Sequence, residues 1–292
     1  MLQSFIILFR ETLEAALVIG IVLGYVIRSG QSEYRKSVYL GLAAGVAASV
    51  LGAFGFQLLA GGFSGRAEEI FEGITMLAGA ILLTTLIAWM IRKSAKAAEL
   101  EQKVASRIKG TRRAGLFLLI FFAVLREGIE SVIFLSAARF ASGENNLLGA
   151  ALGLAAAVLL GLLLFRGALR VNLRSFFAAT NILLILFAAG LLAAGVHELQ
   201  EAGVIPIVLE QVWDINPGMV GDAYPVLHEN GLIGSIAKGL FGYNGNPSLI
   251  EVLVYVVYLI AVLSIWLLGR PSRADRRTGG YSERVGRREA HT

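Results

Sequence analysis

The stretch FIILFRETLE at residues 5–14 places one arginine and two glutamates at the end of an otherwise apolar run. A second stretch, FFAVLREGIE at residues 121–130, repeats this arrangement, with Arg-Glu-x-x-Glu in the same place. Both stretches lie inside long apolar segments of a chain that is 56% hydrophobic and only 16% charged. Apolar blocks of about twenty residues are long enough to cross a bilayer. The sequence therefore predicts an all-α, polytopic membrane protein.

Seven apolar segments are predicted to span the membrane. The first is not a cleavable signal peptide, because no basic region precedes it and charged residues interrupt its apolar run. The polar tail at 270–292 is rich in glycine and arginine and is predicted to be a disordered, basic cytoplasmic segment. The predicted spans are approximately 2–27, 37–60, 68–92, 116–138, 147–169, 175–197 and 248–269.

The charged residues predict the orientation of these spans. Most of the 26 basic residues fall in alternate connections and in the tail, which places those segments in the cytoplasm and the N-terminus outside. This topology accounts for the net charge of +5, so no nucleic-acid partner is expected. The opposite loops, including the long outer loop 198–247, are rich in acids and would concentrate cations at the outer mouth.

The repeated motif predicts an internal repeat. The two copies lie three spans apart, so residues 1–92 and 116–197 are interpreted as two three-helix units. Because three is odd, the second unit would enter the membrane from the opposite side, as in many secondary transporters with a site at the midplane. The span at 248–269 is an addition to these inverted repeats, and residues 1–269 form one seven-span domain.

Arg-Glu-x-x-Glu has a specific consequence inside a membrane. At about 100° per residue, Arg10, Glu11 and Glu14 share one face of their helix. A charged side chain at the centre of a span costs roughly 2.5–3.5 kcal/mol, so six unpaired charges facing lipid would cost on the order of 15–20 kcal/mol. The two motifs are therefore expected to face each other across the repeat axis.

The two motifs together contain four carboxylates and only two guanidinium groups. A structural ion pair does not need the surplus of negative charge, whereas a cation site does. The chain has no cysteine and only three histidines, so the predicted ligands are all oxygens. Oxygen ligands suit ferric iron, magnesium, calcium or manganese and disfavour copper(I) and zinc. This chemistry leaves open which of these metals binds, and whether the glutamates carry protons instead.

Paired Arg-Glu-x-x-Glu motifs in spans 1 and 4 of a seven-span protein resemble the iron permeases of the fungal oxidase-dependent transporter and of the bacterial Efe-type ferrous iron uptake system. The resemblance extends to EGITM at 72–76, to FFAAT at 176–180 with AAG at 188–190, and to GYNGNPS at 242–248. It implies that iron is the transported substrate and that no organic cofactor is bound. The implied iron-binding residues are Glu11, Glu14, Glu127, Glu130 and Glu72, and the implied ion-pair partners are Arg10 and Arg126.

The resemblance also implies a location and partners. A short basic tail favours a bacterial inner-membrane protein, with a periplasmic iron-binding protein and a haem peroxidase, or an oxidase, as partners at the outer loop. The lipid bilayer is the remaining partner. We expect iron to meet a first group of residues at the outer entrance, formed by Glu68, Glu69, Glu72, His197 and Glu198.

Three alternatives stay open at this level. The same scaffold could carry another divalent cation, such as manganese, magnesium or lead. An intramembrane hydrolase is disfavoured because no Ser/His pair, HExxH motif or nucleotide-binding loop lies in the chain at membrane depth. A scaffold subunit held by structural ion pairs is the third reading, and it would tolerate loss of all four glutamates.

Overall fold

The computed structural model describes residues 1–30, 32–93, 113–143, 147–166, 173–216 and 224–268. In these residues the regular structure is helical throughout. The basic segment 94–112 and the tail 270–292 lie outside the described residues. The elements are α1 (Leu2–Arg28), a short 3-10 helix η1 (Ser32–Tyr34), α2 (Arg35–Ala60), α3 (Arg66–Lys93), α5 (Arg113–Ser142), α6 (Leu147–Phe165), α7 (Leu173–Glu201), α8 (Leu232–Phe241) and α9 (Leu249–Leu268).

The helices have the length and composition of membrane spans, which confirms an all-helical, multi-pass membrane protein. By length and hydropathy alone α2, α3, α6 and α7 qualify as spans. Helices α1 and α5 have comparable lengths, at 27 and 30 residues, but each carries the charges of one Arg-Glu-x-x-Glu motif. Large apolar side chains such as Leu51 and Phe54 of α2 point away from the bundle, as expected for a surface that contacts lipid.

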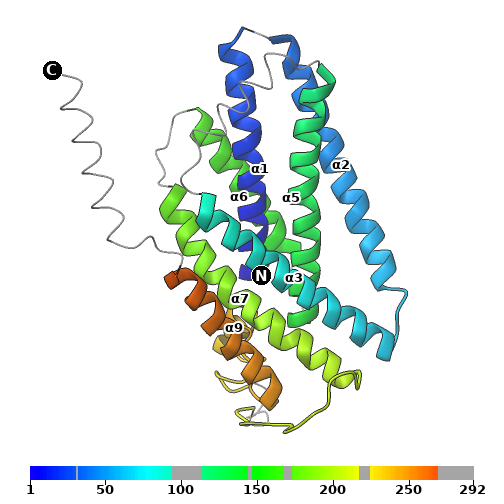
Figure 1. The fold of residues 1–292 in the computed structure, drawn as a ribbon. Helices are drawn as coiled ribbons and strands as arrows, with labels where there is room; N and C mark the ends of the chain where they lie inside the picture. Colours follow the sequence, from blue (N-terminus) through cyan, green and yellow to red (C-terminus); the bar gives the residue numbers. More distant parts are fainter. Residues whose placement is uncertain (31, 94–112, 144–146, 167–172, 217–223, 269–292) are drawn as a thin grey trace, which may run out of the picture.

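The helices pack as three principal pairs that join the two halves of the chain (Figure 1). Helix α6 lies along α1, α2 lies along α5, and α3 lies along α7. The second helix of each half therefore packs on the first helix of the other half. This exchange brings α1 and α5, which carry the motifs, into contact at the centre of the bundle.

Glycines allow the first two pairs to approach closely. A Cβ atom on Gly153 of α6 would lie 2.4 Å from the carbonyl oxygen of Phe5 in α1. A Cβ atom on Gly45 of α2 would lie 3.1 Å from the carbonyl oxygen of Phe121 in α5. Phe5 and Phe121 occupy the same position, five residues before the motif arginine. The two seams are therefore built alike, with small residues that let the helix backbones touch.

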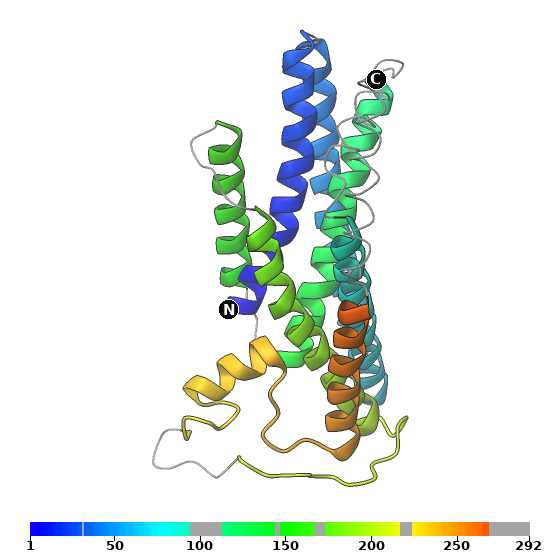
Figure 2. The ribbon, with the colours of Figure 1, turned by 60° about the vertical axis from the view of Figure 1, so that its left-hand side comes forward.

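Helix α8 lies in the segment that the sequence indicates only as a loop, and it packs on α7, α1 and α5. Figure 2 shows it beside the N-terminal end of α1. It ends at Gly242, whose φ of 66° is the left-handed conformation that favours glycine. A Cβ atom there would lie 2.0 Å from the Cα atom of Gly190 in α7, so this end of α8 is held tightly against the bundle.

Candidate metal site

The first half of the site lies on α1 and is almost completely buried. Arg10 has no exposed side-chain surface, and the side chain of Glu11 is 1% exposed. The guanidinium forks between two carboxylates: Nη1 donates to Glu11, and Nη2 lies 2.8 Å from Oε1 of Glu14, one turn further along. Arg10 therefore holds both glutamates of its own motif at once.

The second half lies on α5 and is more open. Arg126 Nε donates to Oε1 of Glu130 over 3.0 Å, and Nη2 lies 3.2 Å from Oε1 of Glu127. The contact pattern matches that of α1, but the Arg126 side chain is 48% exposed. The two motifs thus share their internal ion pairs and differ in how far the arginine is covered.

Carboxylates from the two helices meet between α1 and α5. Glu11, Glu127 and Glu130 each offer an oxygen, and these oxygens lie within 4.8 Å of one another. Two ligands on opposite sides of a small divalent cation are about 4.2 Å apart, since each bond to oxygen is about 2.1 Å. A small inward movement of these side chains would therefore complete a cation site. Glu14 lies outside this group of three and stays with Arg10.

Each of these three glutamates also has an oxygen without a hydrogen bond. Oε2 of Glu11, of Glu127 and of Glu130 is buried and has no hydrogen-bond partner. Buried polar atoms are normally satisfied in native proteins, and an exception calls for an explanation such as an ion. The prediction that the two motifs face each other agrees with this geometry, which brings Glu11 together with Glu127 and Glu130.

Apolar clusters lie on both sides of the site along α1 and α5. Toward the N-terminal end of α1, Ile7 packs in a core cluster with Phe134 of α5, which follows Glu130. Toward the other end, Val22 of α1 packs in a second cluster with Ile120 of α5. All four side chains are 1% exposed or less. On α1 and α5 the carboxylates therefore lie between residues of two apolar clusters.

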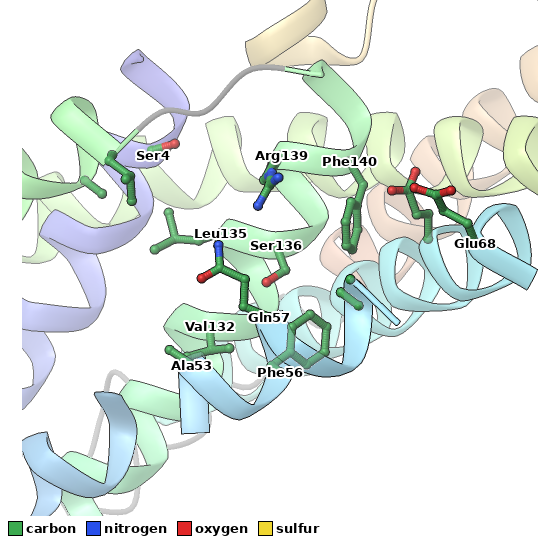
Figure 3. Close-up of a pocket in the computed structure, with 15 residues that line it drawn as sticks. Ser4, Ala53, Phe56, Gln57, Glu68, Val132, Leu135, Ser136, Arg139 and Phe140 are labelled. Atoms are coloured by element: carbon green, nitrogen blue, oxygen red, sulfur yellow. The ribbon is translucent and has the colours of Figure 1, made fainter. Parts of the chain in front are cut away.

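The acids predicted for the entrance gather where α3 begins and α7 ends. Glu68 and Glu72, one turn apart on α3, line a cavity of about 390 Å³ that is described below (Figure 3). Glu198 of α7 has Glu72 and Glu69 among its electrostatic neighbours. Four of the five predicted entrance residues are thus brought together, although Glu198 lies more than 120 residues after the other three in sequence.

The fifth, His197, is held in a hydrogen-bonded network instead. Its Nδ1 lies 3.0 Å from Oε1 of Glu251 in α9, and its Nε2 lies 3.3 Å from Glu201. Glu251 is 2% exposed and also accepts hydrogen bonds from Asn244 and from the backbone of Ser248. This network ties α7 to the start of α9, and it gives His197 a structural role that a lone histidine in the sequence does not reveal.

A second polar network organises the segment between α7 and α9. Asn216 Nδ2, the Gly245 backbone N–H and Lys238 Nζ donate to the Glu229 carboxylate over 2.8–3.1 Å. Burial alone would raise the pKa of this carboxyl, but the hydrogen bonds to Gly245 and Lys238 hold it below its usual range. Glu229 therefore stays ionised and fixes the segment around it.

Sequence reasoning missed two features near the site. Arg139 of α5 and Gln57 of α2 line the same cavity as Glu68 and Glu72, although nothing in the sequence connects α2, α3 and α5 at that level. It also missed the difference in burial between Arg10 and Arg126, because the two motifs read alike. Only packing between distant segments separates them.

Comparison with known proteins identifies the family. Residues 1–269 match the model of the iron permease FTR1 family. Among similar proteins, a ferrous iron permease EfeU of Escherichia coli O6:H1 is 37% identical over 279 residues, which cover 94% of this chain and 97% of the relative. A ferrous iron permease EfeU of Yersinia pestis is 34% identical over 280 residues, covering 94% and 96%. No solved structure matches. The chain therefore belongs to the iron permease FTR1 family, a family of transporters rather than enzymes.

Proposed function

We propose that this protein imports iron across the cytoplasmic membrane through a site that Glu11, Glu127 and Glu130 form between α1 and α5. The observation that carries the proposal is the group of three carboxylates within 4.8 Å of one another. Each has a buried oxygen without a hydrogen bond, so the group is short of positive charge. A passing cation supplies that charge.

The ligand chemistry is consistent with iron. All three groups offer oxygen ligands. The relatives named ferrous iron permease are similar to this chain over nearly its whole length. Oxygen ligands alone do not separate iron from manganese or magnesium. Iron is therefore proposed from the family, and the carboxylates are proposed as the place where it binds.

The arginines act as replaceable partners of the glutamates. Arg10 and Arg126 neutralise part of the carboxylate charge. When a cation binds, the glutamates turn their oxygens toward it and the ion pairs weaken. Glu14, which contacts Arg10 at 2.8 Å, is a fourth carboxylate that can join once the arginine releases it.

Two inverted three-helix repeats and seven spans in all are part of this proposal. The exchanged pairing of α1 with α6 and of α5 with α2 supports the repeat, as do the matching glycine seams. The distribution of basic residues supports an external N-terminus and a cytoplasmic C-terminus. With this orientation the cluster around Ile7 faces outward and the cluster around Val22 faces the cytoplasm.

Transport then requires the two apolar clusters to open in turn. The cluster around Ile7 would act as the outer barrier, and the cluster around Val22 would act as the inner barrier. Rocking of one repeat against the other would open one cluster while the other stays packed. This is the alternating access expected of a secondary transporter.

Iron arrives through the acidic entrance. We propose that Glu68, Glu69, Glu72 and Glu198 attract the cation at the outer end of α3 and α7, while His197 fixes α9 beside them. The segment from 202 to 247 is the surface at which a periplasmic iron-binding protein and a haem peroxidase, or an oxidase, would dock. No organic cofactor is part of the proposed mechanism.

Uptake of labelled iron into proteoliposomes tests this function. The wild-type protein should accumulate iron, and Glu11→Gln and Glu127→Gln should each abolish uptake while the fold is retained. Glu33→Gln is the matched control, because Glu33 forms an exposed ion pair with Arg113 far from the site. Ferrous iron, ferric iron, manganese, magnesium and lead are compared with and without a pH gradient. Uptake of manganese or magnesium in preference to iron would refute the assignment of the substrate.

A further inference from the structure

The cavity that contains Glu68 and Glu72 is formed by five helices. The C-terminal ends of α2 and α5, the start of α3 and the N-terminal ends of α1 and α6 surround it (Figure 3). Its volume is about 390 Å³. A divalent cation with six waters needs only about 180 Å³ at about 30 Å³ per water. The cavity can therefore admit a cation that still carries its hydration shell.

The lining suits a hydrated ion. The Ser4 side chain is only 2% exposed and lines the cavity. The Gln57 amide and the Ser136 hydroxyl, both labelled in Figure 3, add further polar atoms. Such groups can exchange hydrogen bonds with the waters of an entering ion.

One residue in this lining is unexpected in a cation entrance. Arg139 of α5 places a guanidinium in the cavity, and it is one of the charges that Glu72 experiences. It is exposed, and within the described ranges it forms no ion pair with a carboxylate inside 4.0 Å. A purely structural role, in which Arg139 joins α5 to α3, would need an ion pair with a carboxylate of α3. Its charge is therefore available to act on whatever enters.

We propose that Arg139 sets the affinity of this entrance cavity for the arriving cation and keeps it low. The proposal rests on the import function proposed above. The charges of Glu68, Glu72 and Arg139 in the cavity sum to −1, and without Arg139 they would sum to −2. A transport path works only if each station binds a cation strongly enough to admit it and weakly enough to release it. Arg139 prevents the carboxylates of Glu68 and Glu72, one turn apart, from binding the cation too tightly to release it.

The same reasoning predicts a role in selectivity. Hydrated calcium and magnesium fit the cavity as well as iron does, and a stronger negative charge would hold all of them. Arg139 keeps the cavity from filling with these commoner ions. Selection for iron is then left to the carboxylates between α1 and α5, which can bind the ion directly.

Initial rates of ferrous iron uptake into proteoliposomes test the proposal. Arg139→Gln should lower KM about tenfold, because one unit charge beside a divalent ion at an exposed site is worth about that much. It should also lower kcat several-fold, because release becomes slow, and calcium should inhibit at correspondingly lower concentration. Arg139→Lys keeps the charge and should behave as wild type.

Two further variants make the result decisive. Arg66→Gln removes the same charge at the start of α3 but outside the cavity, and it should leave KM and calcium inhibition unchanged. Gln57→Glu adds a negative charge inside the cavity without touching Arg139, and it should reproduce the effects of Arg139→Gln even if that variant fails to fold.

The outcomes separate this proposal from the proposed function. The role of Arg139 is refuted, and import stands, if the wild-type protein transports iron while Arg139→Gln and Gln57→Glu have the same KM and calcium inhibition as Arg66→Gln. A higher KM in Arg139→Gln would refute the role of Arg139 as well. If the wild-type protein moves no iron, import itself is refuted.

Discussion

Loss of Arg10 should destabilise the protein far more than loss of Arg126. Arg10 has no exposed side-chain surface and contacts both Glu11 and Glu14, so Arg10→Gln would leave two carboxylates uncompensated in the core. Breaking a buried ion pair from one side costs about 3–5 kcal/mol. The Arg126 side chain is 48% exposed, so Arg126→Gln should cost less than Arg10→Gln, although it too removes the partner of Glu127 and Glu130.

The difference in stability between Arg10→Gln and Arg126→Gln can be measured as a difference in the free energy of unfolding in mixed detergent micelles. Both variants lose one positive charge from the same motif, so each is the matched control for the other. Arg10→Lys is a third variant: it keeps the charge, but one ammonium nitrogen cannot replace a fork that reaches two carboxylates, and its stability should lie between those of wild type and Arg10→Gln. Equal losses for Arg10→Gln and Arg126→Gln would contradict the burial on which the argument rests.

Three other predictions follow from the site and its surroundings. Glu127→Asp keeps the charge but withdraws the carboxylate from the group of three, so iron uptake in proteoliposomes should fall about tenfold or more; wild-type uptake would show that Glu127 is not a ligand. Gly153→Ala should destabilise the protein by about 1–3 kcal/mol in detergent unfolding, because its Cβ would meet the Phe5 carbonyl oxygen at 2.4 Å, whereas Gly52→Ala, with nothing within 4 Å, should not. The Glu229 pKa lies below its usual range, so the ionised carboxylate stabilises the fold fully above pH 4.5, and this stabilisation is lost as the pH falls through the folded-state pKa. Hydrogen exchange in residues 224–247, corrected for its intrinsic pH dependence, should therefore become faster on acidification of the wild-type protein. The Glu229→Gln variant should not show this pH dependence.

The sequence predicted the helical membrane class and the meeting of the two motifs because both follow from strong local constraints. Charged residues in the middle of an apolar span have few allowed positions, so Glu11 and Glu127 could be expected to face one another. The Iron permease FTR1 family match over residues 1–269 confirms the resemblance that these motifs suggested. The number of spans and their inverted repeat stay predictions.

What the sequence could not predict depends on contacts between distant segments. Two identical arginines in identical motifs differ because other helices cover Arg10 and leave Arg126 half exposed. His197 was predicted as part of the outer entrance, and its hydrogen bond with Glu251, 54 residues away, could not be predicted from the sequence. The position of Arg139 beside Glu72 could not be predicted, because it depends on α2, α3 and α5 enclosing one cavity.

X-ray absorption at the iron edge, on purified protein loaded with one equivalent of ferrous iron, tests the central claim most directly. We expect a first shell of oxygen atoms only, because the three carboxylates from α1 and α5 hold the ion, and we expect the bound iron to be lost when Glu11, Glu127 and Glu130 are all changed to glutamine. A shell containing histidine nitrogen, or full iron loading in the triple variant, would contradict the account.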